Sequence, residues 1–216
     1  MARVGQFAWI GNRTYQGDGT SGVYIWGAML EQGSYSTSYI PTNGSTVTRS
    51  AETANGSGDA ATFNDSEGVL MVEVLRPVSG LATISLSNNT SQNHVSLLFR
   101  TNSTEVWMQM SGNGTESNIF LYDVKQSDNN KISLLYSTGL MKIFVNGFLK
   151  GSTSISALPV GLSNIKYSRG DNGEKFYGNT KQIQYYNSAL TDSELEQLTS
   201  WTSFTDMAEG QLYTIE

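Results

Sequence analysis

Short apolar segments follow one another between residues 69 and 145, and polar turns separate them at spacings of roughly 8 to 14 residues. Residues 94–100 and 105–110 alternate between apolar and polar side chains, which is typical of strands with one buried face. Residues 69–75 are apolar on both faces and predict a central, buried strand. Asn146-Gly147 predicts a tight hairpin turn after the last segment. This pattern favours an all-β sandwich.

The composition agrees with many strands joined by turns and excludes several functions. The 216 residues include 22 Gly, 3 Pro and no Cys, and only 15% of them are charged. Without Cys, disulfides and thiolate metal sites are excluded, which suits assembly in a reducing cytoplasm. The net charge of −6 and the lack of a Lys/Arg cluster argue against nucleic-acid binding. No apolar segment has the length of a signal peptide core or a transmembrane helix, so we expect no membrane insertion.

One helix is predicted near the C-terminus, over residues 190–198. Thr191 is a candidate N-cap, and Glu194 follows at the capping-box spacing. A further strand is possible at residues 211–215. The expected division of the chain is an N-terminal aromatic β-hairpin or attachment segment at 1–49, a main domain at 50–204 and a tail at 205–216.

The N-terminal segment holds two aromatic strand candidates, around residues 6–10 and 23–30. A two-stranded hairpin is marginal alone in water, so it should pack on the main domain or on another subunit. Its aromatic side chains either pack under a loop or contribute to an oligomer interface, where aromatic residues are enriched. The candidate interface residues are Trp9, Tyr24, Trp26 and Tyr39.

Residues 24–42, YIWGAMLEQGSYSTSYIPT, resemble a junction common in phage structural proteins, where one β-module ends and the next begins. The shared features are Trp26-Gly27, Leu30-Glu31 and the stretch from Ser38 to Thr42, with Thr48-Arg49 following. The resemblance implies a virion component, assembled in a host cytoplasm and located on the virion surface. It also implies other virion proteins as partners and a homo-oligomer, with a trimer favoured.

Residues 63–204 resemble a laminin-G-like domain of the concanavalin A-like lectin and glucanase group. Residues 141–151 match the strand, Asn-Gly turn and return strand of that family. Residues 176–195 match its closing pattern of a Gly, a strand, a Tyr-Asn turn and a short Glu-containing helix. The resemblance implies a jelly roll of two antiparallel sheets with one short C-terminal helix. Because the group includes lectins, hydrolases, lyases and inert adhesion modules, the fold alone does not give the function.

The carboxylates and the single histidine do not form a recognisable catalytic motif. Glycosidases of this fold need two carboxylates projecting toward the sugar, and laminarinase-type members carry Glu-x-Asp-x-x-Glu, which is absent here. Glu67 and Glu73 are six residues apart. His94 is expected at the surface of a strand and has no nucleophile elbow nearby. One His and no Cys also make a zinc site untenable. We therefore predict a protein that is not an enzyme.

Strand alternation suggests a carbohydrate-binding face. If Val106, Met108 and Met110 point inward, Trp107 and Gln109 point outward. Sugars stack on aromatic rings beside amides and hydroxyls, so an outward Trp among polar residues predicts a glycan site. The alternative is that the hairpin or a loop covers this face. The candidate carbohydrate-binding residues are His94, Arg100, Trp107, Gln109 and Tyr122.

Calcium is common in the fold group that the chain resembles. Asp171, Asn172 and Glu174 carry oxygen ligands suited to a hard cation, as do residues 64–67. Both clusters are also typical of solvated turns.

Three functions remain open from the sequence. The first is a non-catalytic adhesin on a virion that binds host cell-surface polysaccharide. The second is a purely structural capsid decoration or tail connector protein with an empty lectin-like face. The third is a glycan-degrading enzyme.

Overall fold

The computed structural model describes residues 20, 27–30, 39–48, 58–76, 79–203, 205 and 207. The chain divides into two compact units, Met1–Thr53 and Ala54–Glu216. The larger unit holds every strand and helix described below. The boundaries expected after residues 49 and 204 stay predictions.

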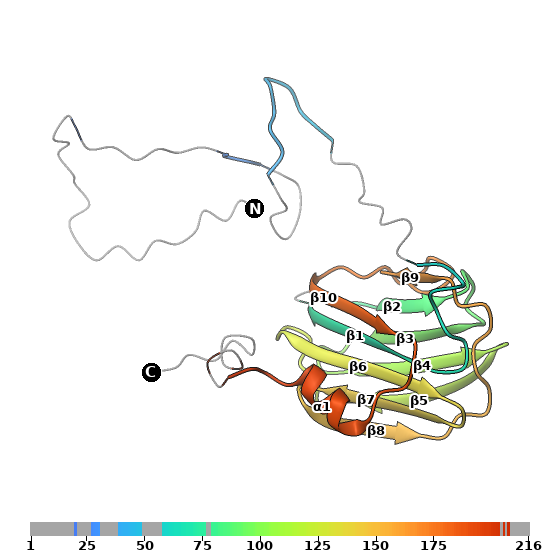
Figure 1. The fold of residues 1–216 in the computed structure, drawn as a ribbon. Coiled ribbons are helices and arrows are strands. Elements are labelled where there is room, and N and C mark those ends of the chain that lie inside the picture. Colours follow the sequence, from blue (N-terminus) through green and yellow to red (C-terminus); the bar gives the residue numbers. More distant parts are fainter. Residues whose placement is uncertain are drawn as a thin grey trace. The chain divides into compact units, whose positions relative to one another are not determined.

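The larger unit is a sandwich of two antiparallel five-stranded sheets (Figure 1). The first sheet, sheet A, has the order β10-β1-β6-β7-β8, and the second, sheet B, has the order β5-β4-β3-β2-β9. The strands are β1 (Gly68–Leu75), β2 (Ala82–Ser87), β3 (His94–Phe99), β4 (Val106–Gly112), β5 (Thr115–Leu121), β6 (Asn130–Ser137), β7 (Leu140–Val145), β8 (Phe148–Thr153), β9 (Asn164–Lys166) and β10 (Asn179–Tyr186). The predicted all-β jelly roll of two antiparallel sheets is confirmed.

The core lies between the two sheets and is built by strand alternation. On β4, Val106, Met108 and Met110 are fully buried in it. Trp107 and Gln109, between them, lie on the opposite face of sheet B, as the alternation predicted. β1 lies between β10 and β6, and its residues from Gly68 to Val74 are buried, which confirms a central strand.

The helix α1 (Asp192–Thr199) covers part of the outer face of sheet A (Figure 1). Thr191 caps it, and the reciprocal bonds between Thr191 and Glu194 form the predicted capping box. Leu195 packs on the helix side of the sheet against Val69 and Phe144. Within the described part of the chain, no helix is long and apolar enough to span a membrane.

Only two residues separate the end of β4 from the start of β5. Asn113 and Gly114 both have a positive φ, at 50° and 83°, and join β4 to β5 in a tight hairpin. This turn pairs Trp107 with Phe120 and so determines what lies beside Trp107. Residues 27–30 are described and are not in a strand, whereas the rest of the two N-terminal strand candidates, and the tail strand at 211–215, lie outside the described residues.

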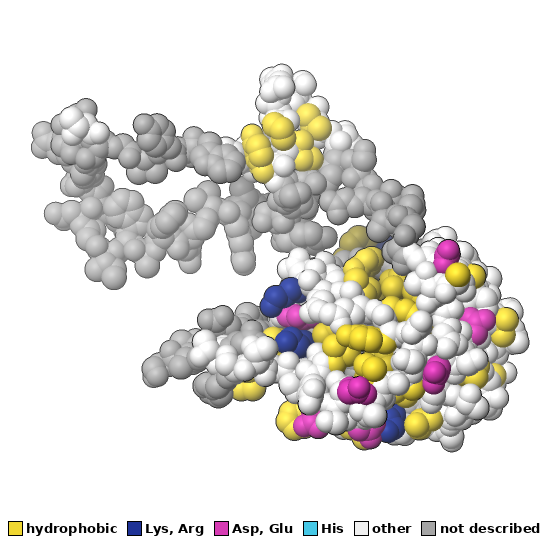
Figure 2. Space-filling view, in the orientation of Figure 1, with side chains coloured by type: hydrophobic (Ala, Val, Ile, Leu, Met, Phe, Trp, Pro, Cys, Tyr) yellow, Lys and Arg dark blue, Asp and Glu magenta, His cyan; other side chains and the backbone are white. Residues whose placement is uncertain are grey.

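The visible face of the larger unit carries few charged side chains (Figure 2). Most of that surface is backbone or uncharged polar side chain, with hydrophobic side chains between. This agrees with a chain in which only 15% of residues are charged.

Candidate functional site

The outer face of sheet B has a covered half and an open half. Over β2 and β3, polar side chains that alternate with the core residues are buried: Thr83, Ser85, Ser87, His94 and Ser96. Over β4 and β5, the corresponding side chains of Trp107, Gln109 and Asn118 are half-buried and that of Phe120 is exposed. A ligand can therefore reach only the half formed by β4 and β5.

The covered half is buried by residues 167–176, which we call the cover segment. Ser85 Oγ donates a 2.7 Å hydrogen bond to the backbone carbonyl of Ser168, and Thr83 Oγ1 donates one of 2.9 Å to Glu174 Oε2. The backbone N–H of Thr83 donates to the carbonyl of Glu174 at 2.8 Å. At Gly170 an added Cβ would lie 2.0 Å from the Thr90 carbonyl oxygen, so only glycine allows this approach.

His94 lies beneath this cover, and its expected surface position is wrong. Its side chain is 1% exposed, and its Nδ1 lies 2.8 Å from Ser96 Oγ. Burial, followed by the charge of Arg169, lowers the pKa of His94 to about 4. A buried, neutral imidazole does not reach a ligand on the open half.

The open half is organised around Trp107. The guanidinium carbon of Arg100 lies 4.0 Å from the centre of the indole ring, within cation–π range. The indole N–H donates a 2.8 Å hydrogen bond to Glu105 Oε1, and the ring of Phe120 meets Trp107 edge-on at a centroid distance of 4.6 Å. We call Arg100, Glu105, Trp107 and Phe120 the Trp107 cluster. The indole is thus held in place on three sides, and the exposed ring beside it is Phe120.

Amide groups continue the open half along the same two strands. Gln109 Nε2 donates to Asn118 Oδ1 at 3.0 Å and to Glu116 Oε2 at 3.2 Å. Gln109 and Asn118 are cross-strand partners, two residues from the pair of Trp107 and Phe120. These groups can exchange hydrogen bonds with sugar hydroxyls.

Tyr122 lies just past the end of β5 and is 64% exposed. The next residue, Asp123, accepts a 2.7 Å hydrogen bond from Lys150 on β8, which joins the two sheets at this edge. Of the five predicted binding residues, the structure therefore brings Arg100, Trp107 and Gln109 together, places Tyr122 after the end of β5, and separates His94 from them.

Asn118 was missed as a candidate, and Phe120, which alternation places opposite Ile119, was not selected as one. The signal that could have found them is Asn113-Gly114, because a two-residue hairpin at this position sets the register of β5 against β4.

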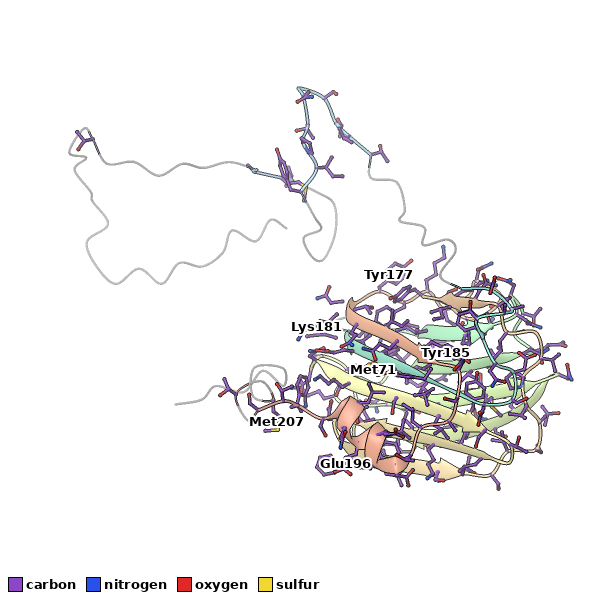
Figure 3. The ribbon with its side chains drawn as sticks, viewed as in Figure 1. Met71, Tyr177, Lys181, Tyr185, Glu196 and Met207 are labelled. Atoms are coloured by element: carbon purple, nitrogen blue, oxygen red, sulfur yellow. The ribbon has the colours of Figure 1, made fainter. Side chains whose placement is uncertain are left out.

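Two of the titratable residues considered for catalysis, His94 and Glu73, are buried and have structural partners. His94 and Ser96 are neighbours, but both side chains are 1% exposed, so this pair is inaccessible to a substrate. Glu73 is 3% exposed and lies on sheet A, where it accepts from Asn129 Nδ2 at 2.7 Å and pairs with Lys181 Nζ at 3.1 Å. Figure 3 labels Lys181 on β10, beside β1.

At residues 171–174, the oxygens proposed for calcium are engaged by cations of the protein. Arg169 donates to both carboxylate oxygens of Asp171, at 2.9 and 2.8 Å, and to Glu174 at 3.1 Å. This pairing lowers the pKa of Asp171 to about 2. Lys166 Nζ donates to Asn172 Oδ1 at 3.0 Å. Among the described residues, no group of three or more His, Cys, Asp and Glu side chains is arranged to hold a metal ion. Calcium binding here stays a prediction that these contacts do not favour.

Of the predicted interface residues, Trp9, Tyr24 and Trp26 lie outside the described residues. Tyr39 is 49% exposed. Its ring lies 3.5 Å from the place that a Cβ added to Gly27 would take, within the smaller unit. A role for these residues in an oligomer interface stays a prediction.

The larger unit is similar in fold to known carbohydrate-binding domains. The CBM40 domain of a Ruminococcus gnavus IT-sialidase, bound to α2,3-sialyllactose, matches with a TM-score of 0.56 and 20% identity. This match covers 69% of this chain and 96% of that one. A leech intramolecular trans-sialidase matches with a TM-score of 0.51 and 16% identity, over 65% of this chain and 24% of that one. No protein-family model and no curated protein sequence matches the chain. At these identities the comparisons show the jelly-roll fold alone.

Proposed function

We propose that this protein binds a cell-surface polysaccharide without cleaving it. The observation that carries this proposal is the open half of sheet B, where the ring of Phe120, backed by Trp107, lies beside the amides of Gln109 and Asn118. An apolar ring face with adjacent hydrogen-bonding groups is the arrangement that recognises a pyranose. The fold similarity to a sialyllactose-bound CBM40 domain supports the same function class.

The setting we propose is a phage particle, and it rests on the resemblance of residues 24–42 to phage structural proteins. In that setting the protein is an adhesin on the virion surface that contacts other virion proteins and host polysaccharide. A homotrimer would present several sites to one polymer, and multivalency would offset weak binding at each site.

The first test is binding of the full-length protein to a panel of bacterial polysaccharides and α2,3-sialyllactose, with released product measured in the same samples. We expect saturable binding without product. Trp107→Ala should weaken binding by about thirtyfold, or about 2 kcal/mol, because Phe120 and Arg100 would lose the indole ring that holds them in place. The matched control is Tyr177→Ala, an exposed tyrosine just before β10 (Figure 3). Trp107 and Phe120 lie on β4 and β5, and β10 belongs to the other sheet.

Three results would contradict parts of this proposal. Unfolding of the Trp107→Ala variant would show that Trp107 acts in folding instead of binding. Equal losses in the two variants would remove the open half as the site. Release of reducing sugar would favour the glycan-degrading alternative.

A second candidate is a structural decoration or connector protein. Its support is two exposed apolar side chains on the edge strand β8, Phe148 at 69% and Leu149 at 47% exposure. Aromatic and aliphatic side chains of this kind occur at protein interfaces. Absence of binding to every glycan would favour this function.

A separate test concerns the N-terminal segment. Deletion of residues 1–48 should lower the oligomer number in light scattering, and an unchanged number would refute an interface in that segment.

A further inference from the structure

Arg100 differs from the other described arginines in how its guanidinium is used. Arg169 donates to the carboxylates of Asp171 and Glu174, and Arg76 donates to Gln126 and to the Gly80 carbonyl. The guanidinium of Arg100 stacks on Trp107 instead, and it donates no hydrogen bond to, and forms no ion pair with, any residue in the described ranges. Its five N–H groups are therefore available to a ligand.

The stacking also fixes where these donors lie. A guanidinium that lies 4.0 Å over an indole ring has lost part of its conformational freedom before a ligand arrives, so binding costs less entropy. The same indole carries Phe120 at its edge, so the charged group and the exposed ring are neighbours through Trp107. Trp107 acts here as a positioning residue.

We propose that the glycan bound at this site carries an anionic group, which Arg100 binds while the adjacent pyranose ring stacks on Phe120. This inference rests on the proposed glycan binding and adds the chemical class of the ligand. The fork of the guanidinium matches the two oxygens of a carboxylate or of a sulfate ester, and such charge-assisted pairs are stronger than neutral hydrogen bonds.

Glu105 provides an internal test of this charge dependence. Its Oε1 accepts the indole N–H at 2.8 Å, so its negative charge lies beside the same ring that carries Arg100. It should repel an anionic ligand, and Glu105→Gln keeps an oxygen acceptor for the indole while removing that charge. The two substitutions should therefore have opposite effects on the affinity for an anionic glycan. Loss of the Arg100 charge should lower that affinity, and loss of the Glu105 charge should raise it.

The experiment compares polygalacturonate with its carboxyl-reduced form, and dextran sulfate with dextran, by calorimetry on the full chain. We expect the anionic member of at least one pair to bind about tenfold more tightly than its neutral form, the ratio expected for one charge-assisted pair. The pair that shows the preference identifies the anion as carboxylate or sulfate. The preference should shrink between about 0.05 M and about 0.5 M salt, because screening weakens exposed charge pairs.

In Arg100→Gln the ratio of anionic to neutral affinity should fall to about one, because glutamine carries no charge to pair with the anion. Arg100→Lys keeps the positive charge but loses the forked N–H groups of the guanidinium, so it should retain part of the preference for the anionic polymer. Glu105→Gln should raise the affinity for the anionic polymer several-fold. Circular dichroism and melting curves establish that each variant is folded.

Equal binding of anionic and neutral polymers by the wild type would overturn the inference and leave glycan binding intact. A preference for the anionic polymer that survives in Arg100→Gln would also overturn the inference, because a residue other than Arg100 would then bind the anionic group. If the wild type binds none of the four polymers and no glycan of the first panel, both proposals are overturned.

Discussion

Replacement of His94 with Gln should remove a pH-dependent part of the protein's stability. Burial of the imidazole and the nearby charge of Arg169 lower the pKa of His94 from 6.5 to about 4, although the Ser91 carbonyl and Asp171 oppose them. Between these two pH values the unfolded chain binds a proton at this position and the folded protein does not. The free energy of unfolding therefore falls as the pH drops from 6.5 to 4. Above pH 6.5 the imidazole is neutral in both the folded and the unfolded state, so His94 does not lower the stability there.

The size of the effect follows from the shift in pKa. Each unit of pKa difference corresponds to about 1.4 kcal/mol, so the wild type should lose about 3 kcal/mol from this residue by pH 4. Glutamine does not titrate, so the variant should not lose this unfolding free energy at low pH. The carboxylates titrate in the same range in both proteins, so their contribution cancels in the difference between wild type and variant.

The assay is urea unfolding of wild type and His94→Gln at intervals from pH 7.5 to pH 4, followed by circular dichroism. The difference in free energy of unfolding should change by about 3 kcal/mol across that range, in the direction that penalises the wild type at low pH. A difference that stays constant with pH would refute the reasoning. It would mean that His94 is as accessible in the folded protein as in the unfolded chain, and that the cover segment does not enclose it.

Three further substitutions test the packing at Gly112, with Gly114 as its control, and the helix cap. Gly112→Ala would place a Cβ 2.2 Å from the Leu158 carbonyl oxygen and should cost about 3 kcal/mol in urea unfolding, whereas Gly114→Ala meets nothing within 4 Å and should cost only the ~1 kcal/mol of its positive φ. Equal costs would contradict the close approach at Gly112. Thr191→Ala should cost about 1 kcal/mol by removing the helix cap, and an unchanged unfolding midpoint would show that the capping box contributes no stability.

Much of the fold could be predicted because local patterns decide it. Alternation on β4 separated Met108 in the core from Trp107 and Gln109 on the outer face, and Asn146-Gly147 marked the β7–β8 hairpin. The capping box at Thr191 likewise depends on residues three apart. Each of these features is specified by neighbours in the sequence.

The covered half of sheet B could not be predicted in the same way. His94 alternates with core residues as an exposed strand residue would, but the cover segment, more than seventy residues later, lies over this half of the sheet. That segment has no periodic pattern, and its approach depends on single contacts such as Gly170 against Thr90. The register that places Phe120 beside Trp107 and Asn118 beside Gln109 likewise depends on the pairing of β5 with β4.

The pairing of β1 has a consequence for synthesis of the chain. β1 is the first strand of the jelly roll to leave the ribosome, yet its partners are β6 and, much later, β10. At about 5–20 residues per second, several seconds separate translation of β1 from that of β10. During that interval an apolar strand, Gly68–Leu75, has an open hydrogen-bonding edge that can pair with other nascent chains. Translation of Tyr186, the partner of Val69, ends this exposure and completes the register of the central strand.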